Sequence, residues 1–213
     1  MRSRPLINGF IFLSSFLITS NSIAETVSLE YVGFYDRLKQ VNKQNYQLVE
    51  LAFSVPITSD CTIKSGSITT ENATYPLTYT KQQRLFIPFD AQLKSDRGLV
   101  NLEVAGDASQ CAIAMQVRAR ETQQHYTQAQ LLALNTDMNR LLDGLQGFPM
   151  KYFRKPIDGI TFDFTDENVT VNIDDKVQQV TKKLTLKLEQ INQLQQLSFS
   201  SKPSVVSPLV LSN

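Results

Sequence analysis

The chain has 213 residues, of which 21 are basic and 20 acidic, so its formal charge at pH 7 is +1. Hydrophobic residues make up 42% of the sequence and charged residues 19%, which is typical of a globular protein and excludes a disordered one. A near-neutral chain lacks the basic surface that nucleic-acid binding requires, so we expect no nucleic-acid partner.

The first 24 residues have the pattern of a secretory signal peptide. Arg2 and Arg4 precede a mostly apolar run, Leu6–Ile18, and the small residues Ser22 and Ala24 follow it. The apolar run is shorter than the roughly 20 residues that cross a membrane. We therefore expect cleavage after Ala24 and a mature form without a transmembrane segment. Its expected location is the periplasm, where disulfides can form.

After this segment we expect a short helix and then several antiparallel strands. Apolar side chains recur at helical spacing over Glu30–Asn42, and their aromatic members are expected to dock on the sheet rather than line a ligand groove. The predicted strands, separated by turn-forming pairs such as Ser65-Gly66, are Val49–Val55, Cys61–Lys64, Ser67–Thr70, Tyr75–Tyr79, Leu85–Phe89, Leu99–Ala105 and Cys111–Arg120. Short strands with such turns favour a sandwich-like or curled sheet.

Thr127–Gly147 is the longest predicted helix. Thr127 and Gln130 have the spacing of a capping box at its start, and Gly144 and Gly147 are available to end it. Large apolar residues form a stripe along one face: Leu131, Leu134, Met138, Leu141 and Leu145. We expect this stripe to pack the helix on its own sheet, the alternative being an interface for self-assembly or a partner.

The remainder of the chain is expected to form a C-terminal antiparallel β unit. The apolar residues of Val177–Leu194 fit a strand or a helix, so this segment is ambiguous. The expected elements are a hairpin over 160–173 with its turn at 165–168, a turn at 174–175, a strand to Leu188, a short helix to Gln195 and an extended surface tail from Ser198.

Together these elements predict an α+β fold that is mainly antiparallel β, with one long amphipathic helix and a C-terminal β-hairpin unit. The expected organisation is a signal peptide at 1–24, a β-rich region with a short N-terminal helix at 25–121, the amphipathic helix at 122–147 and the C-terminal β unit with its tail at 148–213. We expect these regions to form one compact domain.

Cys61 and Cys111 both follow the predicted cleavage site, and we expect them to form a disulfide. Each lies among alternating apolar residues, which predicts that both point to the buried face of a strand. A redox or nucleophilic pair would need an exposed, electropositive thiol or a Cys-x-x-Cys spacing, and the sequence has neither.

The sequence contains no motif for catalysis, for a cofactor or for a metal ion. His125 is the only histidine, and neither a Gly-x-Ser-x-Gly elbow nor a phosphate-binding glycine loop is present. Carboxylates crowd the predicted second β unit, where we expect them to form turns: Asp163, Asp166, Glu167, Asp174 and Asp175. We therefore expect a protein that is not an enzyme and takes no cofactor, with a carboxylate-based hydrolase as the alternative.

The segment Lys151-Tyr152-Phe153-Arg154-Lys155 is the candidate interaction patch, because it combines three cations with two aromatic rings. Such a patch suits contact with an anionic envelope component or with the acidic face of an envelope protein. The alternative is a linker whose rings anchor in the core while its cations stay solvated.

Four stretches carry a family resemblance: Gly33–Lys39 with Val41–Lys43 after it, Cys61–Gly66, Arg84–Asp90 and Gln110–Arg118. They resemble small exported proteins of Gram-negative bacteria that are grouped as a domain of unknown function. The resemblance covers most of the mature chain and implies a bacterial periplasmic setting, in agreement with the signal peptide. It implies no activity, cofactor or catalytic residue. We therefore expect a non-catalytic binding or accessory module of the cell envelope, with a hydrolase or a self-assembling structural subunit as alternatives.

Overall fold

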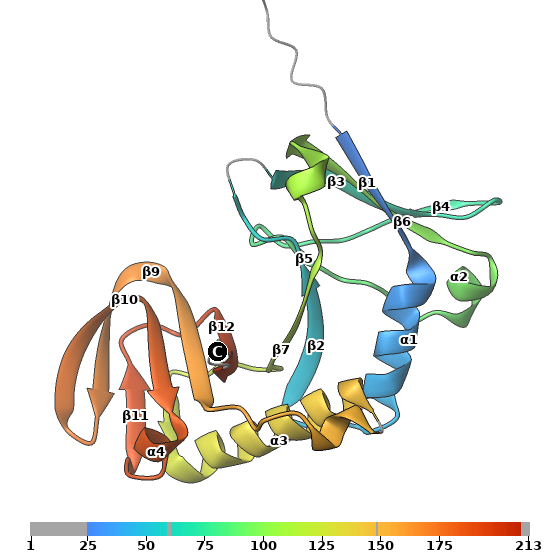
Figure 1. Cartoon of the computed structure of the whole chain (residues 1–213). Helices are drawn as coiled ribbons and strands as arrows, with labels where there is room; N and C mark the ends of the chain where they lie inside the picture. Colours follow the sequence, from blue (N-terminus) through green and yellow to red (C-terminus); the bar gives the residue numbers. More distant parts are fainter. Residues whose placement is uncertain (1–24, 59–60, 148, 210–213) are drawn as a thin grey trace, which may run out of the picture.

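The computed structural model describes residues 25–58, 61–147 and 149–209, and the predicted signal peptide lies outside these ranges. The fold is α+β with mostly antiparallel strands that form a curled, half-barrel sheet, which confirms the predicted class (Figure 1). Among the described helices none is both long enough and apolar enough to cross a membrane.

Strands dominate the order of elements, and helices interrupt them. The elements are β1 Glu25–Glu30, α1 Tyr31–Asn42, β2 Val49–Ser54, β3 Cys61–Thr69, β4 Thr74–Pro76, β5 Arg84–Leu85, α2 Ala91–Ser95, β6 Leu99–Gly106, the 3-10 turn η1 Ala108–Gln110, β7 Ala114–Ala119, β8 His125–Thr127, α3 Gln128–Gln146, the 3-10 turn η2 Met150–Tyr152, β9 Gly159–Ile173, β10 Lys176–Lys187, α4 Leu188–Ile191, β11 Gln196–Phe199 and β12 Val205–Leu209. The sequence analysis missed β1, α2 and β8. Each exposes most of its side chains, so its hydrophobic periodicity is weak.

The strands pair in three antiparallel groups. One has the order β1-β6-β3-β4, a second has the order β5-β2-β7, and the third has the order β10-β9-β11-β8 with β12 also paired to β9. In Figure 1, α3 runs across the base below β2 and the C-terminal strands, and α1 rises along one side. The buried apolar side chains of all these elements belong to one core cluster.

The aromatic face of α1 docks on the sheet, as predicted. Tyr31 is fully buried, and its hydroxyl donates to the Pro88 carbonyl oxygen at 2.7 Å. Phe34 packs edge-on against Phe53 of β2 with ring centroids 5.0 Å apart, and Tyr35 stacks on Phe89. These rings anchor α1 and do not line a groove.

The prediction for α3 is confirmed at both ends. Thr127 caps the helix in a capping box with Gln130, and Gly147 follows its last turn with φ of 67°. The predicted apolar stripe is 0–9% exposed along its whole length. It therefore packs the helix on its own protein and is not available for self-assembly.

Two predicted turns are parts of continuous strands. Ser65-Gly66 lies within β3, where the pairing with β6 shifts register between Ile63 and Ser65. The glycine is needed for close packing, because a Cβ there would meet Leu102 and Leu77 side-chain atoms at 3.3 Å. The predicted turn at 165–168 likewise lies within β9, whose chain reversal comes only at Asp174 and Asp175, both at positive φ.

The segment after Ser198 was predicted as a surface tail, and this is wrong. β11 pairs with β8 and β9, and β12 pairs with residues 159–163 of β9. Phe199 and Val206 are buried. Burial of these apolar side chains stabilises the paired strands, so Pro203 and Pro208 do not keep the segment on the surface. The ambiguous segment before it forms the predicted strand and short helix, β10 and α4.

The predicted disulfide is present. Cys61 of β3 and Cys111 are bonded, with their Cα atoms 5.4 Å apart. The predicted strand position is correct for Cys61 but wrong for Cys111, which caps η1 in the loop before β7. The bridge therefore ties a strand to a loop, and both cysteines are less than 5% exposed.

Candidate interaction surface

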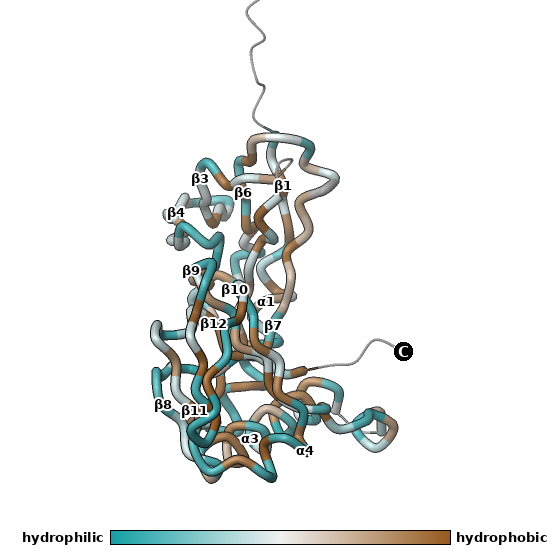
Figure 2. Tube along the Cα trace, turned by 90° about the vertical axis from the view of Figure 1, so that its left-hand side faces the viewer, coloured by the Kyte–Doolittle hydropathy of each residue, from teal (hydrophilic) through white to brown (hydrophobic). Residues whose placement is uncertain are grey.

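The segment between α3 and β9 presents large apolar side chains to solvent. We call residues 149–155 the tip loop. Met150 is 56% exposed, Tyr152 71% and Phe153 76%. In Figure 2 the stretch that follows α3 stands out to one side of the body. Three such exposed side chains within four consecutive residues form a cluster that is typical of a contact surface.

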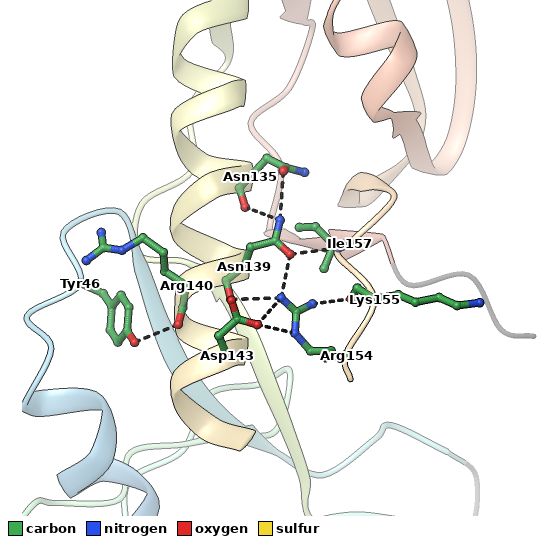
Figure 3. A network of polar contacts seen from close by, with 8 residues as sticks. All are labelled: Tyr46, Asn135, Asn139, Arg140, Asp143, Arg154, Lys155 and Ile157. Atoms are coloured by element: carbon green, nitrogen blue, oxygen red, sulfur yellow. Dashed lines mark hydrogen bonds and ion pairs between the residues drawn. The ribbon is translucent and has the colours of Figure 1, made fainter. Parts of the chain in front are cut away.

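Arg154 fixes the tip loop to α3. Its side chain is only 13% exposed and lies 2.7 Å from Asp143 Oδ1 through Nη2, with Nε donating to the same oxygen at 2.9 Å. Nη2 also donates to Asn139 Oδ1 at 2.9 Å, and Nη1 donates to the Lys155 carbonyl oxygen at 2.8 Å. Figure 3 shows the guanidinium directed toward the helix.

Asn139 is the centre of this network. Its Oδ1 also accepts from the Ile157 amide at 3.0 Å, and its Nδ2 donates to the carbonyl oxygen and Oδ1 of Asn135 at 3.1 and 3.2 Å (Figure 3). Asn135, Asn139 and Asp143 follow one another at intervals of four, so α3 presents them in one row. Through Asn139 and Asp143, the row holds Arg154 at the end of the tip loop, and through Asn139 it also holds Ile157, just before β9.

The residues of the predicted patch therefore fall into two groups, one facing α3 and one facing solvent. Arg154 is an internal anchor, whereas Lys151 and Lys155 remain exposed, and the Lys155 side chain points away from the network in Figure 3. The Lys151 ammonium lies 5.0 Å from the centroid of the Tyr152 ring. The rings of Tyr152 and Phe153 do not anchor in the core, because both are more than two thirds exposed.

A further cation lies where α3 ends. Arg37 of α1 is exposed and donates to the Leu145 carbonyl oxygen at 3.4 Å. Cations near the carbonyl end of a helix are favoured by its dipole. This end of α3 thus combines positive charge with the apolar tip.

Three of the carboxylates considered for catalysis make ion pairs or hydrogen bonds within the hairpin region. Asp163 pairs with Lys183 across the β9–β10 hairpin at 3.3 Å, and Glu167 pairs with Lys182 at 3.2 Å. Asp174 accepts hydrogen bonds from the backbone amides of Gln195 and Gln196. Asp174 and Asp175 follow one another at the chain reversal and line one small depression with Gln195 and Gln196, whereas Asp163 and Glu167 lie further along β9.

His125 lies exposed on β8, and no group of three potential metal ligands occurs within the described ranges. On the β5-β2-β7 group, Arg118 is buried, and Arg84 and Glu50 near it are partly exposed. Burial lowers the pKa of Arg118, Arg84 lowers it further, and Glu50 opposes both effects. Glu50 Oε1 lies 2.6 Å from Arg84 Nη2, although the angle is too poor for a hydrogen bond. The pair is an ion pair of the sheet.

Sequence reasoning missed a groove of about 520 Å³ beside the first half of α3. Ala129 and Ala133 of α3 leave space opposite Leu48 and Tyr126, and polar side chains such as Arg120 form its rim. The two alanines, four positions apart beside the leucine stripe, were the signal that could have indicated a depression.

The comparisons add one relationship. No curated protein and no solved structure matches the chain. A family described as Protein of unknown function (DUF2987) matches residues 23–164, which is the stretch from just before β1 to the middle of β9. Since this match covers two thirds of the sequence and agrees with the resemblance of its motifs, the chain belongs to the DUF2987 family.

Proposed function

We propose that this protein is an exported, non-catalytic binding module of the cell envelope. The observation that carries the proposal is the tip loop, in which Met150, Tyr152 and Phe153 are all more than half exposed. Fully burying such side chains stabilises a complex by roughly 1.5–3 kcal/mol each, so their exposure in the free protein favours a surface that is covered in use.

Anchoring by Arg154 supports a binding role. Loops that must become ordered on binding lose affinity to conformational entropy, and the contacts of Arg154 with Asn139 and Asp143 order this loop beforehand. A purely connecting loop would have no need of a partly buried cation in this position. The disulfide supports export, because such bonds persist in oxidising compartments.

The test of binding is sedimentation of the processed protein with the envelope fraction of a Gram-negative cell. The double variant Tyr152→Ser/Phe153→Ser should lose most of the bound protein. The matched control is Ile57→Ser/Val177→Ser, because these residues are 64% and 68% exposed elsewhere on the surface. Equal recovery of both variants would show that the tip loop does not mediate binding. Export is tested separately by N-terminal sequencing, with Glu25 expected as the first residue.

A further inference from the structure

We infer that the tip loop inserts its apolar side chains into the interfacial region of an anionic lipid surface. This inference rests on the proposed function and names the chemistry of the partner. Three observations carry it: the projection of the loop, the kinds of side chain that it exposes and the position of its charges.

The shape of the loop suits a lipid surface better than a protein surface. The exposed residues surround the single 3-10 turn η2, which belongs to the stretch after α3 whose backbone lies to one side of the body in Figure 2. A convex tip of this size can bury its side chains on a protein only in a matching pocket. Lipid head groups, in contrast, rearrange around an inserted tip.

The chemistry of the side chains points the same way. Tyrosine is enriched at membrane–water interfaces, where an apolar ring and a polar hydroxyl both find favourable surroundings. Phe153 and Met150 would occupy the apolar side of that boundary. Lysine side chains next to them can keep their ammonium groups among the head groups while their methylenes cover apolar surface.

The exposed charges of the tip loop itself are positive, while Asp158, Glu189 and Lys187 lie on the depression next to Lys155. Lys151 and Lys155 are exposed on the loop, and Arg37 lies beside the end of α3. Asp143, the acid nearest the loop in the network, is held in the ion pair with Arg154. An anionic surface therefore attracts this end of the molecule, whereas a neutral lipid surface attracts only its apolar side chains.

Arg154 limits the entropic cost of insertion. Because it holds the loop to α3, the rings are already ordered before they meet the lipid surface. Few side chains insert, so we expect reversible binding that weakens with salt. Each lysine near an anionic surface contributes about fivefold in affinity, so replacing both should weaken binding about 30-fold.

The chain contains no tryptophan, which provides a site-specific probe. Phe153→Trp keeps an aromatic ring at the most exposed position of the tip. Its emission should shift to shorter wavelength when phosphatidylcholine vesicles that contain phosphatidylglycerol are added. Tyr75→Trp, at a position 45% exposed on β4, is the control and should show no shift.

Affinity is then measured by co-sedimentation of the disulfide-bonded protein with the same vesicles. Lys151→Ser/Lys155→Ser should bind about 30-fold more weakly to anionic vesicles and unchanged to pure phosphatidylcholine. Tyr152→Ser/Phe153→Ser should bind at least about 100-fold more weakly to both lipid preparations, because each buried ring contributes about tenfold or more. The control Ile57→Ser/Val177→Ser should bind like the unmodified protein.

Absence of binding to anionic vesicles, or equal binding by all variants, would overturn the lipid inference. If the native envelope fraction still retains the protein through Tyr152 and Phe153, the partner is an envelope protein and the proposed function stands. If neither preparation retains it through these residues, the proposed function fails as well.

Discussion

Replacing Asn139 with alanine should destabilise the protein by about 3 kcal/mol. The change removes the acceptor for the Ile157 amide, and Ile157 is only 3% exposed. A buried amide without a partner costs about 1–3 kcal/mol, and loss of the hydrogen bond from Arg154 costs about 1.5 kcal/mol or more. The better helix propensity of alanine returns about 0.6 kcal/mol. In a domain of this size, the expected fall in melting temperature is about 6–12 °C.

The assay is urea unfolding followed by circular dichroism, with the disulfide kept oxidised. Thr136→Ala is the matched control, because Thr136 is exposed on the same helix and bonds back to the Leu132 carbonyl oxygen. It should at most raise the free energy of unfolding by about 0.6 kcal/mol, which is the same gain in helix propensity. If Asn139→Ala lies within the range of this control, the network does not hold the tip loop and the argument from pre-ordering is wrong.

Four further predictions concern the fold. Reducing the Cys61–Cys111 bond, whose cysteines are 50 residues apart, should lower the free energy of unfolding by about 4 kcal/mol, and a double alanine variant should show no response to reductant. Gly159→Ala should cost about 3 kcal/mol or more in the same unfolding assay, because φ is 156° and a Cβ would lie 2.0 Å from the Leu186 carbonyl oxygen. Gly33→Ala, with open space around the new methyl group, should instead stabilise α1 by about 0.5–1 kcal/mol. Burial raises the pKa of the Tyr126 hydroxyl above its usual 10.0, against the lowering effect of its hydrogen bond from the Gln123 amide. As the pH rises, the unfolded chain therefore loses the Tyr126 proton before the folded protein does. The free energy of unfolding should be constant up to about pH 9 and fall above pH 10, and the fall should be less steep in Tyr126→Phe. Equal slopes for the two proteins would contradict this assignment.

Local chemistry explains which elements were predictable from the sequence. Thr127, Gln130 and Gly147 define both ends of α3 through contacts within one turn, so spacing alone located the helix. The two strands divided in error, β3 and β9, contain residues that usually form turns. Gly66 is kept in β3 by Leu102 and Leu77, and nothing near it in the sequence reports those neighbours.

The tip loop shows the same limit. Its composition was enough to identify a patch of cations and rings, but the direction of each side chain depended on partners elsewhere. Arg154 turns inward because Asn139 and Asp143, 15 and 11 residues earlier, present acceptors on α3. The row of polar residues beside the leucine stripe was a usable signal, since such a row on a packed helix needs partners.

The pairing of β9 determines when, during synthesis, the edges of this strand are protected from aggregation. Residues 159–163 pair with β10 on one side and with β12, near the end of the chain, on the other. Until Val205–Leu209 have emerged from the ribosome, that edge of β9 has no partner. An open strand edge is a template for pairing with other molecules. A chain that stops before residue 205 would therefore be expected to accumulate as aggregates or be degraded, although every element of the N-terminal strands is complete.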